Sequence, residues 1–219
     1  MINHNYYFEK IFLHFKNHKK LDFWNEPNRF NDDVVIQSDA MHKAELPIFL
    51  KSNGIKYRTI TDEVNKLIDE NIHYVESAKS GDCVFNLKRY NKYEDHIEYI
   101  KSLESAYPDQ VRVITIGKTY QRRDLNVIEV TKGDNKRRPL IFIECGVHAR
   151  EWITPAGCAW IVDDLIHNYN ENSTLNDYDY HVITISNPDG YVYTWNEDRL
   201  WRRNRFVKPI DSEEQKYDS

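Results

Sequence analysis

The 219-residue sequence has few cysteines and no long apolar stretch. Its three cysteines, Cys83, Cys145 and Cys158, are too few for a disulfide scaffold and form no C-x-x-C metal pair. No stretch approaches the roughly 18 consecutive apolar residues that a membrane-spanning helix needs. The sequence therefore predicts neither a disulfide-rich mini-protein nor a membrane-spanning helix.

The sequence also lacks an excess of positive charge. Its 35 acidic and 30 basic residues give a net charge of -5, so electrostatics provides no reason to expect a nucleic acid or an anionic membrane as partner. A hydrophobic content of 40% with 13% aromatic residues is enough to build a core, which excludes a disordered chain. No internal repeat or low-complexity segment is present.

The first 72 residues predict a small α+β unit. Apolar periodicity predicts helices at 7–18, at 43–52 and from Thr61 onward, and strands at 21–24, 34–36 and 55–60. The buried face of the third helix should consist of Val64, Leu67 and Ile68. Residues 73–86 are polar and contain small residues, a composition that predicts a connector.

The remaining residues, 87–219, predict an α/β unit. Strands are expected at 111–116, 125–130, 140–143 and 182–185, helices at 90–107 and 155–169, and a turn at 187–190. The near-continuous apolar run at 140–143 predicts a strand that is covered on both faces.

The segment 146–152 follows that strand, at the position where open α/β sheets place their ligands. His148 and Glu151 are three residues apart, so in a helical turn an imidazole nitrogen and a carboxylate face one cation. Two segments with the same His-to-Glu spacing, 42–45 and 73–76, lie beside ordinary surface residues or in the connector and are not expected to bind metal. The alternative for the first pair is a loop histidine that is hydrogen-bonded to backbone.

The sequence at 141–153 resembles the zinc-binding core of the metallocarboxypeptidases of the pancreatic A/B type. The resemblance continues through 187–191 and 199–205, in the order and approximate spacing of that family. Upstream, 21–27 and 49–55 resemble the pro-segment that precedes such enzymes. The resemblance thus covers nearly the whole chain.

This resemblance implies a fold and a function. It implies an α+β pro-domain at 1–72, a connector at 73–86 and the N-terminal part of a mixed-sheet α/β catalytic domain at 87–219. The implied protein is a secreted, zinc-dependent carboxypeptidase zymogen that hydrolyses the C-terminal peptide bond of peptides and proteins. A trypsin-like protease would activate it by cutting the connector at Lys79, with Lys88 and Arg89 as competing sites.

The resemblance also implies residue roles. His148 and Glu151 would be two of three zinc ligands in a His₂Glu site with an open water position, a ligand set for which carboxypeptidase A is itself a standard example. Arg202 would place positive charge at the scissile carbonyl, where the oxyanion develops, and would also bind substrate. Its alternative is a surface arginine. Arg150 would line the substrate groove or form a salt bridge.

A disulfide between Cys145 and Cys158 is implied by the B-type branch of the same family. The alternative, in a cytosolic protein, is two reduced and buried thiols. No signal peptide is visible at the N-terminus, so the chain either stays inside the cell or has lost its beginning.

The remaining functional groups of the family are expected after 199–205 and have no counterpart in this sequence. They are an Asn-Arg pair for the substrate carboxylate, the third ligand histidine, a tyrosine and the general-base glutamate. The chain is therefore expected to be an incomplete zymogen, inactive alone, with its A-type or B-type specificity open. The alternatives are an inactive, truncated homologue with a binding or regulatory role and an unrelated α/β protein.

Overall fold

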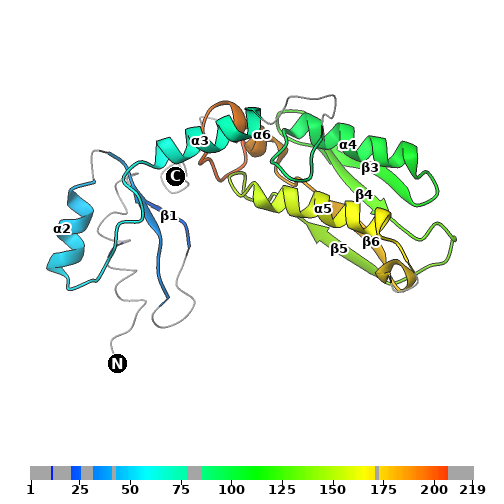
Figure 1. Cartoon of the computed structure of the whole chain (residues 1–219), viewed down its shortest axis with the longest axis horizontal. Coiled ribbons are helices and arrows are strands. Elements are labelled where there is room, and N and C mark those ends of the chain that lie inside the picture. The colour runs from blue at the N-terminus through cyan, green and yellow to red at the C-terminus, as the bar shows by residue number, and fades with distance from the viewer. Residues whose placement is uncertain are drawn as a thin grey trace, which may run out of the picture. The chain divides into compact units, whose positions relative to one another are not determined.

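The computed structural model describes residues 11, 21–25, 32–40, 43–77, 85–170 and 173–206, with the side chains at 71 and 73–77 excepted (Figure 1). The chain divides into two compact units, one within residues 1–62 and one within residues 63–209. None of the described helices combines the length and apolar content that crossing a bilayer requires.

The first unit contains a two-stranded antiparallel sheet and one described helix. Strands β1 (Leu21–Phe23) and β2 (Ile36–Ser38) pair with Leu21 opposite Ser38, and α2 spans Glu45–Ser52. A small core forms around Ile11 and Leu50. The predictions for β1 and α2 are confirmed, whereas β2 lies two residues later than predicted. Except for the helical Ile11, the predicted helix at 7–18 lies outside the described residues.

Two predictions at the end of this unit and just after it are wrong. Residues 55–60 form no strand, and 56–60 are exposed, because a local alternation pairs only where a partner strand and an apolar cover are available. Helix α3 (Val64–Ser77) forms, but Leu67 is 53% exposed and does not belong to a buried face. The helix also runs past residue 72 into the predicted connector, of which 78–84 lie outside the described residues.

The second unit is built on a four-stranded sheet that is mixed, as predicted, and its strand order is β3-β4-β6-β5. The last of these strands along the chain begins three residues before the predicted range of 182–185. The strands are β3 (Val111–Lys118), β4 (Asp124–Val130), β5 (Leu140–Glu144) and β6 (Asp179–Ile183). Neighbours pair antiparallel except β5 and β6, which are parallel. The helices are α4 (Tyr93–Ala106), α5 (Ile153–His167), the short 3₁₀ helix η1 (Thr174–Asn176) and α6 (Pro188–Asn196).

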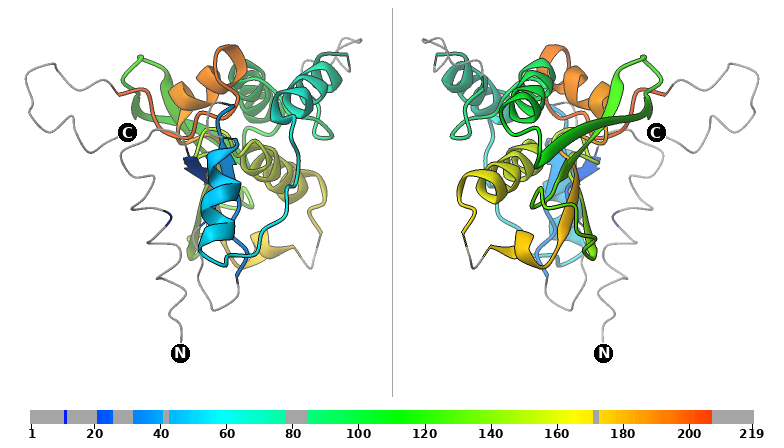
Figure 2. Two further views of the ribbon diagram at one scale, coloured as in Figure 1. Left: turned by 90° about the vertical axis from the view of Figure 1, so that its left-hand side faces the viewer. Right: turned by 90° about the vertical axis from the view of Figure 1, so that its right-hand side faces the viewer.

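Helices α4 and α5 cover one face of this sheet (Figure 2). The main core forms where Ile100 of α4 and Val162 of α5 meet Ile128, Val130 and Val182 of the central strands. All five side chains are almost completely buried. Their burial supplies the main apolar stabilisation of the unit, since burying one such side chain is worth about 1.5–3 kcal/mol.

The opposite face carries a polar row. The Glu129 carboxylate bridges Arg112, at 2.6 Å, and the Nε2 atom of His181, at 3.0 Å. Beyond His181, β5 exposes Leu140 and Phe142 by 51% and 56%. The prediction that this strand is covered on both faces is therefore wrong for the described residues, because α4 and α5 pack on the other face of the sheet.

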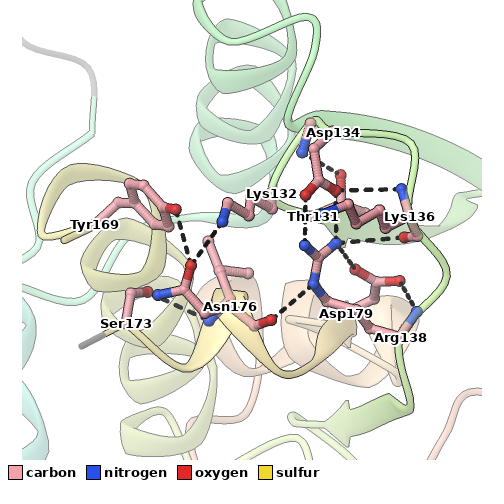
Figure 3. Close-up of polar contacts among 11 residues, drawn as sticks. Thr131, Lys132, Asp134, Lys136, Arg138, Tyr169, Ser173, Asn176 and Asp179 are labelled. Carbon is pink, nitrogen blue, oxygen red and sulfur yellow. Dashed lines mark hydrogen bonds and ion pairs between the residues drawn. The ribbon is translucent and has the colours of Figure 1, made fainter. Parts of the chain in front are cut away.

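A polar cluster centred on Arg138, the Arg138 cluster, holds the segment between β4 and β5 (Figure 3). The guanidinium donates to both carboxylate oxygens of Asp134, at 2.6 and 2.7 Å, and to the backbone carbonyl of Asn176 at 3.0 Å. These bonds hold the pKa of Asp134 well below its usual range. Lys132 and Tyr169 both donate to the side-chain oxygen of Asn176. These side chains bind to one another and to the backbone of η1, which indicates a structural role.

Candidate metal site

The candidate site lies on the turn that joins β5 to α5. Gly146 starts this turn with a φ of +70°, and a Cβ there would come within 3.1 Å of Ile185 Cα, so the position favours glycine. The backbone N–H of Glu151 donates to His148 O at 3.2 Å, and Thr154 N donates to Glu151 O at 2.9 Å. The chain therefore coils tightly into α5 and brings both candidate ligands to one side.

The candidate ligands contact each other directly. His148 Nδ1 lies 2.9 Å from Glu151 Oε1, and the two side chains are 38% and 43% exposed. Two ligands on one tetrahedral zinc, each about 2.0–2.1 Å from the ion, lie about 3.3 Å apart. The pair thus has the donor chemistry and nearly the spacing of two zinc ligands, and a separation of a few tenths of an ångström would admit the ion.

The described residues contain no group of three or more His, Cys, Asp or Glu side chains that could hold a metal ion. The two predicted ligands fit zinc as part of a site. The other segments with their spacing provide no comparison, since His42 lies outside the described residues and the side chain of His73 is not described.

The segment after α6 packs against the candidate site. Ala149 N donates to the carbonyl of Arg202 at 3.0 Å, and Arg199 Nη1 donates to the carbonyl of Arg150 at 2.8 Å. The Arg199 guanidinium also lies 3.6 Å from the ring centroid of Trp152, where a cation–π contact is favourable. Burial lowers the pKa of Arg199 from its usual value. The backbone of the predicted oxyanion residue therefore runs directly beside the metal-site turn.

The two predicted substrate-binding arginines, Arg150 and Arg202, differ in burial. Arg150 is buried, and its Nη1 donates to the carbonyl of Leu200 at 3.5 Å, which joins it to the same segment. Arg202 is half-buried. The structure thus brings the turn and the segment that carries Arg202 together through backbone bonds. The substrate roles of both arginines stay predictions.

Cys145 and Cys158 are joined by a disulfide in the structure, with Cα atoms 6.3 Å apart. The bond links the end of β5 to α5 and so spans the turn that carries the candidate ligands. Cys83 lies outside the described residues.

The sequence predicts a turn at 187–190 and indicates no role for its side chains. The structure begins α6 at Pro188, with Asn187 as its capping residue. Asp189 is buried and accepts hydrogen bonds from Thr119 Oγ1 and Arg123 Nη1, at 2.7 and 2.8 Å. The Asn-Pro pair, a cap followed by proline at the first helical position, contained a signal for the helix. Nothing local pointed to the partners of Asp189, which lie 66 and 70 residues away.

Comparison with family models divides the chain into two matched regions. Residues 96–210, over half of the chain, match the zinc carboxypeptidase model, and residues 10–71 match the carboxypeptidase activation peptide model. Among curated proteins, carboxypeptidase A4 of Mus musculus is 32% identical over 88% of this chain and 47% of its own length. Carboxypeptidase B of Rattus norvegicus is 32% identical over 86% of this chain and 46% of its own.

Solved structures of related proteins have the same fold. Thrombin-activatable fibrinolysis inhibitor matches with a TM-score of 0.76 at 25% identity, over 92% of this chain and 52% of its own. Carboxypeptidase A from Helicoverpa armigera matches with a TM-score of 0.78 at 24% identity, over 90% of this chain and 50% of its own. The chain spans about half the length of the curated relatives it matches. It belongs to the zinc carboxypeptidase family, with an activation-peptide region before its catalytic region.

Proposed function

We propose that this chain forms part of a zinc metallocarboxypeptidase zymogen that hydrolyses the C-terminal peptide bond of peptides and proteins. His148 and Glu151 are the proposed zinc ligands. The observation that carries the proposal is their direct contact, Nδ1 to Oε1 at 2.9 Å, within the region that matches the family. An imidazole nitrogen and a carboxylate oxygen are the donors that zinc takes in catalytic sites of this class.

Each residue of the site has a proposed task. Zinc, when bound, supplies an activated water and polarises a carbonyl. His148 binds through Nδ1 and therefore has to be neutral, while Glu151 adds a negative charge. Arg202 provides positive charge for the developing oxyanion, and Arg150 lines the substrate groove. The backbone bond from Ala149 to Arg202 supports this assignment because it keeps the two segments adjacent.

Activity is tested in a chimera. Residues 85–206 of this chain would be joined to the remaining catalytic region of rat carboxypeptidase B, and release of C-terminal amino acids would be assayed with zinc. We expect activity that is lost in His148→Asn and retained in His167→Asn. The control histidine also contacts an acidic side chain, Asp163, at 3.1 Å. Equal activity in both variants would reject the metal assignment. A two-ligand chain alone should show no peptidase activity.

The zymogen part of the proposal concerns residues 1–72 as pro-segment, 73–86 as connector and 87–219 as catalytic region. The match to an activation peptide supports a proteolytic activation step. The proposed activator is a trypsin-like protease that cuts at Lys79, which lies outside the described residues. Limited trypsin digestion followed by N-terminal sequencing tests this. Early cleavage within 111–130 with Lys79 intact would contradict it.

We further propose that the protein is secreted, since a Cys145–Cys158 disulfide persists in an oxidising compartment. Peptide mapping without reduction, on protein made through a secretory route, should recover the two cysteines in one linked peptide. Two free thiols under those conditions would contradict secretion.

A further inference from the structure

Asn187 lies where three segments around the candidate metal site meet. It is buried, and its backbone N–H donates to Gly146 O at 3.0 Å. Its side-chain Nδ2 donates to Val147 O at 3.1 Å, and its Oδ1 accepts from Gly190 N at 3.0 Å. The two ends of one amide thus have separate tasks. The acceptor end caps α6, and the donor end holds the peptide group directly before His148.

Gly190 brings the third segment to the same point. A Cβ at this position would lie 2.5 Å from the carbonyl oxygen of Arg203 and 2.7 Å from Asn187 Nδ2. Real side chains do not tolerate such distances, so only glycine lets the 199–206 segment approach the start of α6. That segment is the one whose Arg202 carbonyl accepts from Ala149. Asn187 and Gly190 therefore provide a second connection between the turn and the arginine segment.

We propose that Asn187 is a positioning residue for the zinc ligands. Its donor end fixes the Val147 carbonyl, and this restricts the backbone from which the His148 side chain extends. This inference rests on the proposed function for the role of the ligands, but the holding of the turn stands on the hydrogen bonds alone. Residues that orient metal ligands commonly change metal affinity by about 10–100-fold when they are replaced.

The Asn187→Asp variant separates the two ends of the amide. Aspartate retains the acceptor for Gly190 and is a good helix cap, but it presents a carboxylate instead of a donor to the Val147 carbonyl. We expect α6 to be retained and the melting temperature to fall, because a buried carboxylate then faces the Val147 carbonyl, which has lost its donor. The Ala149 amide, which is completely buried and bonded to Arg202, should exchange its hydrogen about tenfold faster or more.

Zinc affinity at His148, followed by NMR of the 219-residue chain, should fall by about tenfold in the same variant. This direction is informative because an added negative charge alone strengthens cation binding. Asn126→Asp is the matched control: it adds the same charge on β4, where Asn126 Oδ1 only accepts, from Thr115. We expect no change at Ala149 in the control. Asn187→Ser, which also keeps a capping oxygen and removes the amide, serves if the aspartate variant does not fold.

Hydrogen exchange decides the inference, and zinc titration decides the proposed function. Unchanged Ala149 exchange in both Asn187→Asp and Asn187→Ser would overturn the inference. Faster exchange of the Ala149 amide hydrogen, with unchanged or tighter zinc binding, would overturn the claim that Asn187 positions the zinc ligands. Faster exchange in a protein whose wild type shows no zinc response at His148 would reject the zinc role while retaining the holding of the turn.

Discussion

The Arg123–Asp189 and His148–Glu151 contacts have nearly the same length, 2.8 and 2.9 Å, but different surroundings. The Asp189 side chain is only 4% exposed, whereas that of Glu151 is 43% exposed. The Asp189 carboxylate also accepts from Thr119 Oγ1 and from the backbone N–H of Gln121, at 2.7 and 2.9 Å. The Asp189 carboxylate is therefore buried and accepts three hydrogen bonds, whereas the Glu151 carboxylate remains accessible to solvent.

This difference separates structural from binding polar groups. Asp189 joins the β3–β4 hairpin to the start of α6. The Arg138 cluster joins the β4–β5 segment to η1 in a similar way, through hydrogen bonds within the protein. A buried, fully paired group loses much when its partner is removed, whereas an exposed pair contributes little to stability. An exposed His–Glu pair on a tight turn instead keeps its donors available for a ligand.

The largest expected effect is at the buried pair. Asp189→Ala should lower the free energy of unfolding by about 3–4 kcal/mol, because it leaves three donors without their acceptor. Asp189→Asn, which keeps one acceptor oxygen, should cost clearly less. Urea denaturation of both variants measures the difference. A smaller loss of unfolding free energy in Asp189→Ala than in Glu151→Ala would contradict the distinction between the buried and the exposed pair.

Low pH should destabilise the fold through a different buried group, His96. His96 is 1% exposed, its Nδ1 has no hydrogen-bond partner among the described residues, and burial lowers its pKa to about 4. The unfolded chain takes up this proton near pH 6.5, so stability is complete above that pH. It falls as the pH drops from about 6.5 to 4, by about 3 kcal/mol in total. His96→Phe should flatten this part of the curve of unfolding free energy against pH. An unchanged slope would contradict the assignment.

A smaller effect is expected in the Arg138 cluster. Arg138→Lys keeps the charge but cannot donate to both Asp134 oxygens and the Asn176 carbonyl in the same geometry. The melting temperature should fall by a few degrees, about 2–4 °C. Differential scanning calorimetry with Arg112→Lys as control tests this, since the side chain of Arg112 is mostly exposed. Equal shifts in the two variants would remove the distinction between enclosed and exposed arginines.

The smallest stability effect is expected at the candidate site. Glu151→Gln changes a side-chain contact whose members are both more than a third exposed, so the free energy of unfolding should change by no more than about 0.5 kcal/mol. Urea denaturation at neutral pH provides the measurement. A loss above about 2 kcal/mol would assign Glu151 to the structural class with Asp189.

The sequence predicts most strands and the two long helices of the second unit, because these segments are rich in apolar residues. It does not predict α6, and it places β6 three residues late. Patterns that depend on distant partners are less reliable. Residues 55–60 alternate like a strand without forming one, and the apolar run of β5 does not reveal that β5 is an edge strand in the described sheet. A local pattern specifies which faces are apolar but not which element covers them.

The candidate site divides in the same way. The spacing of His148 and Glu151 is local, so the sequence predicts that the pair lies together, and the structure places the two side chains in contact. The groups that hold the turn are remote: Asn187 follows Val147 by 40 residues, and Arg202 follows Ala149 by more than 50. Their hydrogen bonds follow from the fold and not from any motif.

Zinc titration of the 219-residue chain, observed through the NMR signals of the histidine rings, tests the central claim most directly. We predict weak binding that perturbs the His148 signals, with zinc affinity about tenfold lower or more in Glu151→Gln. Asp163→Asn, which removes the acidic partner of the exposed His167, should leave that affinity unchanged. A zinc response that is centred on His167, or equal affinities in wild type and Glu151→Gln, would contradict the assignment of His148 and Glu151 as the metal pair.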